Sequence, residues 1–167
     1  MSRLEEGTRN LLVFHTSAIG CAFSLEAVQE IVPMVLLSSP PGMPLGLAGF
    51  LDLRGTAIPI LRLDRLFDLP EQLPGLYTPF IILHAADTLI GVLVGSVQEI
   101  VSATAASVLA LPEKHVFQGC ATATVEVNGQ VIYLLSAESM LIENERRSLT
   151  EFQAVAQMRL RHLEQSH

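Results

Sequence analysis

Lysine is almost absent from the chain. Lys114 is the only lysine, and the other nine basic residues are arginines. The acidic residues number 17, which gives a formal net charge of −7. Surfaces that bind nucleic acids need clustered cations, and anionic membranes attract the same clusters. The composition therefore excludes nucleic acid as a partner and disfavours attachment to a membrane surface.

An uninterrupted hydrophobic run is also missing. The longest apolar stretch, residues 31–51, is broken by four prolines that a membrane-spanning helix does not tolerate. The first seven residues include acids and lack the apolar core of a signal peptide, so we expect a cytoplasmic protein with no membrane insertion. Half of the residues are hydrophobic, which predicts a folded core and some apolar surface kept for partners.

Catalytic and metal-binding motifs are absent from the sequence. Cys21 and Cys120 lie far apart, as expected for free buried thiols in a reducing compartment. The five histidines show no metal-ligand spacing, and no serine lies in a nucleophile motif. The glycine-rich stretch Gly42–Gly49 contains no lysine for a phosphate. We therefore expect a protein that is not an enzyme and binds no metal or cofactor.

An internal repeat organises the chain. The pentapeptide VQEIV occurs at residues 28–32 and again at 97–101, and residues 10–15 match residues 79–84 at the same offset. The two copies are 69 residues apart. A second block matches at a separation of 74 residues, and in it Gly55 aligns with Gly129. Such colinear matches indicate two related halves.

Each half, approximately 9–70 and 78–142, contains short apolar segments separated by turn signals, which is typical of small barrels or sandwiches. Because 60 residues alone bury only a marginal core, we expect the two units to share an apolar seam. The VQEIV segments fit a strand or a helix; Ser24 as an N-cap slightly favours a helical turn.

The C-terminal residues predict an amphipathic helix over Ser148–Gln165. Ser148 and Glu151 fit a capping box at its start. Apolar residues then recur at helical spacing, at Leu149, Phe152, Ala156, Leu160 and Leu163. This helix either packs on the preceding domain or is offered to a partner.

Arg54 and Gly55 form the first candidate binding site. The second half has Asn128 and Gly129 at this place, a preferred pair for a tight hairpin turn. Turn geometry does not require arginine, so Arg54 indicates a binding partner; the alternative is a solvated arginine or an ion pair with Asp52 or Asp64.

The loop before this hairpin is unusually apolar. Met43, Leu45, Leu47 and Phe50 lie in a stretch rich in proline and glycine, where they cannot all turn inward. They form either a docking patch for a partner or part of the seam between the two units.

The segment Pro40–Phe67 resembles the signature of the CheW-like domain family. The matching positions are Pro41, Pro44, Gly49, Leu53, Arg54, Gly55, Pro59, Ile60, Leu63 and Leu66. Residues 13–32 and 89–101 are similar to the family's first strands and to the core of its second half.

The resemblance implies a mostly β fold of two packed five-stranded SH3-like barrels, with short helices and a C-terminal helix. The domain would span 9–146, followed by a helical extension over 147–167. Members are non-enzymatic adaptors that couple the cytoplasmic tips of methyl-accepting chemoreceptors to the regulatory domain of CheA-type histidine kinases, in arrays at the inner face of the membrane. The resemblance places Arg54 in the region that faces the receptor. The expected binding residues are Met43, Leu45, Leu47, Phe50, Asp52, Arg54 and Gly55.

Three residues depart from the family pattern: Asp52, Gly95 and Ser136. Asp52 could pair with Arg54 and compete with a partner's carboxylate. The departures leave open an adaptor for twitching or another non-flagellar output. Two further alternatives are a small-ligand sensor that uses the seam between the barrels, and self-assembly through the C-terminal helix without a kinase.

Overall fold

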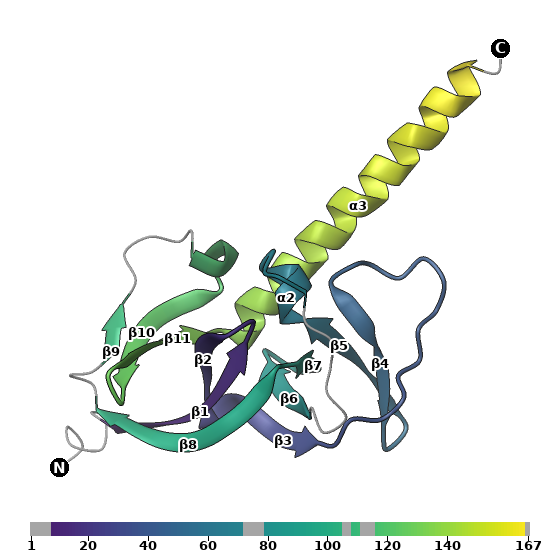
Figure 1. The fold of residues 1–167 in the computed structure, drawn as a ribbon. Helices are drawn as coiled ribbons and strands as arrows, with labels where there is room; N and C mark the ends of the chain where they lie inside the picture. The colour runs from purple at the N-terminus through teal and green to yellow at the C-terminus, as the bar shows by residue number, and fades with distance from the viewer. Residues whose placement is uncertain (1–7, 72–78, 105–107, 111–115, 166–167) are drawn as a thin grey trace.

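The computed structural model describes residues 8–71, 79–104, 108–110 and 116–165. Within these residues the chain forms two β-sheets and a long C-terminal helix (Figure 1). The elements up to residue 71 are β1 (Thr8–Thr16), β2 (Ile19–Ser24), the 3₁₀ turn η1 (Leu25–Ala27), β3 (Val28–Val32), β4 (Leu47–Leu53), β5 (Thr56–Arg62) and α2 (Leu63–Leu66). The later ones are β6 (Phe80–Ala85), β7 (Thr88–Leu93), β8 (Ser96–Thr104), β9 (Val108–Ala110), η3 (Val116–Gly119), β10 (Ala121–Val127), β11 (Gln130–Leu135) and α3 (Ala137–Gln165).

The two halves of the sequence exchange strands. One sheet has the order β8-β1-β2-β11-β10-β9, and the other has the order β3-β6-β7-β5-β4. Each sheet therefore takes two strands from the start of one half and the remaining strands from the other half. The expectation of one unit per half is wrong, because the inter-half pairs β1–β8 and β3–β6 build the sheets.

The predicted mostly β architecture is confirmed, with a difference in strand number. In the described residues the first sheet has six strands rather than five, because the short β9 pairs with the outer edge of β10. Closure of the sheets into barrels stays a prediction.

The first strand of each half is apolar on both faces because each face meets a different core. In β1, Leu12 and Phe14 enter the large central cluster, while Leu11 and Val13 enter a second cluster within the six-stranded sheet. β6 repeats this division between the central cluster and a third one. The central cluster contains side chains from both sheets, which is the shared apolar core that the sequence predicts.

Both VQEIV segments are strands, so the helical alternative is wrong. Val28–Val32 forms β3 and pairs with β6, and residues 97–101 lie in β8 beside β1. Only Leu25–Ala27 turns helically, and Ser24 makes no side-chain cap hydrogen bond there. Pairing with the other half decides the conformation of these segments.

The C-terminal helix is longer than predicted. α3 runs without interruption from Ala137 to Gln165, so Ser148 lies inside the helix and does not cap it. The Ser148 hydroxyl donates to the carbonyl of Asn144, the bond that a serine makes in the middle of a helix.

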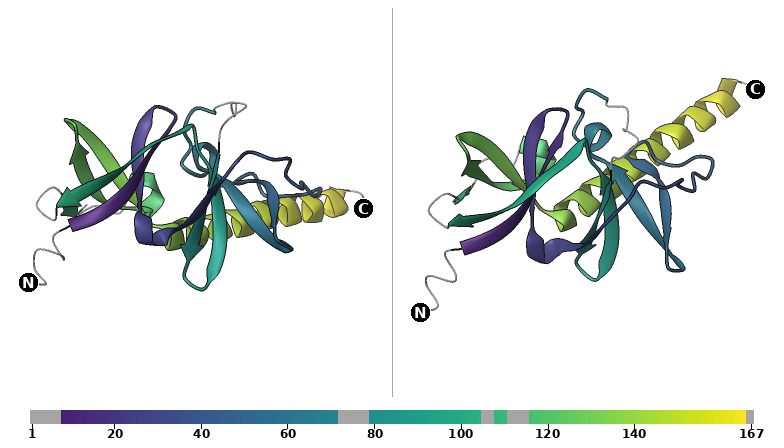
Figure 2. Two further views of the ribbon diagram at one scale, coloured as in Figure 1. Left: turned by 90° about the horizontal axis from the view of Figure 1, so that it is seen from below. Right: turned by 60° about the horizontal axis from the view of Figure 1, so that its bottom comes forward.

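The first turns of α3 anchor it between the sheets, and the rest projects away from them (Figures 1 and 2). Met140 is fully buried in the central core. Arg147 donates to the carboxylate of Asp68 at 2.8 Å and to the carbonyl of Arg65 at 3.2 Å. These bonds tie α3 to α2 and its following turn, and so fix the direction in which the helix leaves the body.

Candidate functional site

The β4–β5 hairpin ends in the turn that holds Arg54. Arg54 (φ 51°) and Gly55 (φ 89°) both have left-handed backbone conformations, as do Asn128 and Gly129 in the other half. Two consecutive residues with positive φ are typical of a type I′ hairpin turn, in which asparagine is favoured and arginine is not. The first half thus keeps an unfavourable residue at a position where its partner half has the preferred one.

Arg54 connects the two edges of the five-stranded sheet. Its Nη2 donates to Glu30 Oε1 at 2.6 Å, although β3 and β4 are the outermost strands of that sheet. The hydrogen bond and the charge of Glu30 raise the pKa of Arg54 above its ordinary value. The side chain remains 69% exposed, so much of the five-donor guanidinium stays accessible to a second carboxylate.

The alternative ion pair of Arg54 with Asp52 or Asp64 does not form, because Arg54 pairs with Glu30. Asp52 Oδ1 instead accepts the backbone N–H of Gly55 at 2.9 Å and so closes the turn. Asp64 is buried and pairs with Arg62 at 2.6 Å. Asp52 therefore stabilises the turn that presents Arg54 and does not compete for its cation.

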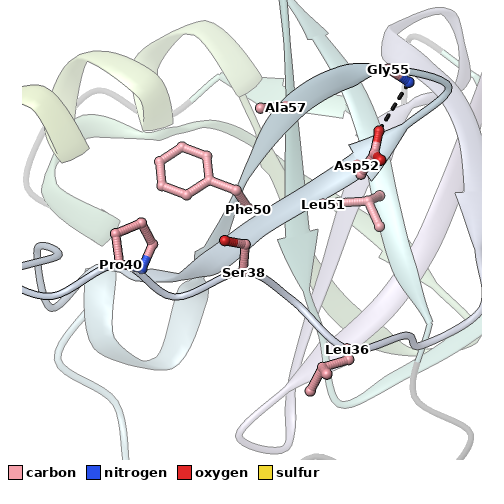
Figure 3. Close-up of a pocket in the computed structure, with 8 residues that line it drawn as sticks. All are labelled: Leu36, Ser38, Pro40, Phe50, Leu51, Asp52, Gly55 and Ala57. Atoms are coloured by element: carbon pink, nitrogen blue, oxygen red, sulfur yellow. Dashed lines mark hydrogen bonds between the residues drawn. The ribbon is translucent and has the colours of Figure 1, made fainter.

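A groove of about 490 Å³ lies beside this hairpin (Figure 3). One wall is formed by β4 and the start of β5, and the other by the chain after β3. Ser38 in that chain and Phe50 in β4 exchange two backbone hydrogen bonds of 2.9 and 2.8 Å, which join the walls. Figure 3 shows Phe50 and Pro40 at one end and the Asp52–Gly55 hydrogen bond at the other. The lining residues are Leu36, Ser38, Pro40, Phe50, Leu51, Asp52, Gly55 and Ala57.

Only some of the predicted binding residues meet at this groove. Phe50, Asp52 and Gly55 line it, and Arg54 lies at its hairpin end. Leu47 is 6% exposed in the central core, and Met43 is partly buried against that core, so both belong to the seam rather than to a free patch.

Leu45 is exposed but lies in a different place from the groove. Its backbone N–H donates to Glu151 Oε2 of α3 at 3.3 Å, and its carbonyl accepts from Arg65 Nη1 at 3.3 Å. These bonds hold the proline-rich loop against the two helices, which explains why Leu45 and Phe50 do not form one patch.

Glu30 and one wall of the groove were not predicted from the sequence. Leu36 is 99% exposed at this wall, and Ser38 completes it. The apolar run 34–37 between prolines was a signal for such a wall, because a loop with no strand partner cannot bury it all. Glu30 gave no comparable signal, since its approach to Arg54 depends on the curvature of the sheet.

Cys21 and Cys120 are free, buried thiols. Burial raises the pKa of the Cys21 thiol to about 12, and burial together with the charge of Glu143 does the same for Cys120. Within the described part of the chain, no three His, Cys, Asp or Glu residues gather as a metal site requires. No helix in that part combines the length and apolar character needed to cross a membrane.

A smaller hollow of about 290 Å³ is lined by residues of both sheets and the start of α3. Arg9, His84 and Glu138 are among its lining residues, together with Leu134 and Leu135. A small ligand in this hollow would contact both sheets.

Comparisons with known proteins agree with this architecture. The sequence matches the CheW-like domain family over residues 10–145. No curated protein matches the chain. The fold is similar to the crystal structure of the scaffolding protein TtCheW from Thermoanaerobacter tengcongensis, with a TM-score of 0.74 and 19% identity over 79% of this chain and 91% of that chain. The family match covers most of the chain and includes the Arg54 hairpin, so this protein belongs to the CheW-like domain family.

Proposed function

We propose that this protein is a non-enzymatic adaptor that couples the cytoplasmic tips of chemoreceptors to a CheA-type histidine kinase at the inner face of the membrane. The observation that carries the proposal is Arg54, an exposed cation held in an unfavourable turn conformation beside an apolar groove. The family match and the scaffolding role named for TtCheW support the same function.

The groove suits a helical hairpin with apolar side chains and one carboxylate. Phe50 and Leu36 would supply the apolar contacts, and Arg54 would bind the carboxylate with the donors that Glu30 leaves accessible. Receptor binding would thus fix the receptor tip to the β4–β5 hairpin.

Kinase binding would use the edge strands. Ile31 on β3 and Ile100 on β8 hold the same place in the VQEIV repeat, and both are exposed on the outermost strands of their sheets. Unpaired strand edges with exposed apolar side chains are ready partners for another barrel. The adaptor would then transmit receptor conformation by contact and perform no chemistry.

The test is a pull-down with size-exclusion chromatography against a receptor-tip hairpin and a kinase regulatory domain. Wild type should bind both. Arg54→Glu should weaken receptor binding by at least about tenfold, because it repels the partner's carboxylate as well as Glu30. Kinase binding should persist.

Arg54→Asn is the matched control, because asparagine occupies the same turn position in the other half. It should preserve the turn and still lose receptor affinity. Receptor binding that survives both substitutions would contradict the assigned role of Arg54. Wild type that binds neither partner would contradict the adaptor function, and a metabolite-dependent rise in melting temperature would instead favour a ligand at the hollow between the sheets.

A further inference from the structure

The projecting part of α3 has a narrow apolar stripe along one side. Ile142, Leu149, Ala156 and Leu163 are spaced seven residues apart, and Leu160 lies beside them. On a helix with 3.6 residues per turn, these five positions fall within about 60° of the circumference. The four larger side chains are 55–60% exposed and Ala156 is half-buried, so the large apolar side chains of the stripe face solvent.

Charges flank this stripe in a self-complementary way. Glu145 lies near the body and Arg159 near the tip, both exposed and both on the same side of the stripe. In an antiparallel pair of helices, equal sides of the two helices face each other. Two copies of α3 would therefore place each Glu145 against the Arg159 of the other copy.

We propose that α3 pairs antiparallel with α3 of a second copy of this chain. This proposal goes beyond the adaptor function and does not depend on it. The alignment that joins Glu145 to Arg159 also brings Leu160 close to Ile142 of the other copy, and it places the two Leu149 side chains near the symmetry axis. The stripe would then be buried over the length of the overlap.

Net charge favours this orientation. Each chain carries a formal charge of −7, whereas residues 148–165 contain two arginines and two glutamates and are neutral. A parallel pair would bring the two acidic bodies together at one end. The antiparallel pair joins the neutral segments and keeps the bodies at opposite ends of the paired helices.

Charge exchange tests the proposal on the full-length protein. In Glu145→Arg and in Arg159→Glu, both cross-pairs of the homodimer become like-charged, so sedimentation should show dimerisation weakened about tenfold. An equimolar mixture of the two variants should recover the dimer, because each variant supplies the charge that the other needs. The double variant E145R/R159E should recover it as well.

Met158→Glu is the matched control, because Met158 is exposed and lies about 200° from Ala156, away from the stripe. This variant should dimerise like wild type, whereas Leu149→Glu should be monomeric with an unchanged circular dichroism spectrum. A wild type that stays monomeric up to its solubility limit would overturn the proposal. A wild-type dimer that Leu149→Glu leaves intact, or a variant mixture that stays monomeric, would overturn it equally.

Discussion

Glu143 shows how single residues hold the long helix in place. Its side chain is only 8% exposed, and it accepts hydrogen bonds from Arg146 and Arg147. The bond from Arg146 is the main cause that lowers the pKa of Glu143 below its ordinary value of 4.5; burial opposes this, and Arg147 adds to it. The carboxylate is thus stabilised in its charged form at the base of α3.

The first prediction concerns acid stability. Because the folded pKa of Glu143 is lowered, its contribution is fully present above pH 4.5 and is lost as the pH falls through the folded pKa. Glu143→Gln should cost about 1–2 kcal/mol at neutral pH and flatten the fall in stability below pH 4.5. Urea denaturation at several pH values measures both. An equally steep acid transition in the variant would contradict this role.

Sequence could identify Arg54 but not its environment. Comparison with Asn128 marks Arg54 as a residue that its turn does not require. Glu30 lies 24 residues earlier, and its approach to Arg54 follows from how the sheet brings its two edge strands together. Such a contact between distant edges leaves no local pattern.

At the scale of elements, the strands were largely predictable and the helix boundary was not. Short apolar segments and the turn residues between them located the hairpins, since both signals are local. Ser148 and Glu151 have capping-box spacing, but the helix begins at Ala137 and runs past them. The stretch Glu143–Arg147 is polar throughout and resembles a loop in sequence. In the structure it is helical, and Glu143, Arg146 and Arg147 pair with one another and with Asp68 in the turn after α2.

Ser148→Ala distinguishes the two interpretations of this position. An N-cap serine would lose about 1 kcal/mol on substitution by alanine. Inside a helix, alanine has the better propensity, so we expect unchanged stability or a gain of a few tenths of a kcal/mol, roughly. Thermal denaturation of the full-length protein measures the sign. A clear loss of stability would contradict a continuous helix.

At the scale of the whole molecule, the repeat predicted two related units but not how they combine. Local patterns determine which segments are strands, and they do not determine which half supplies the neighbouring strand. Neither half can complete a sheet alone, because β1 and β2 need β8 and β11 while β6 and β7 need β3 and β5. The central core also takes side chains from both halves.

Separate expression of the halves tests this dependence. Residues 1–75 and 76–167 should each lack a cooperative unfolding transition, and mixing them should restore one together with the β-sheet signal in circular dichroism. We expect this recovery because only the mixture can form the β1–β8 and β3–β6 strand pairs. A half that unfolds cooperatively by itself would contradict the prediction.

The strand exchange also bears on how such a chain could have arisen. A single ancestral module with this strand order would have left its first two strands without their neighbours. Two identical modules could satisfy each other by trading strands, as domain-swapped homodimers do. Joining two such genes end to end would then have turned an association between molecules into a fold within one. Afterwards each copy could change separately, and one turn could acquire Arg54 while the other kept Asn128.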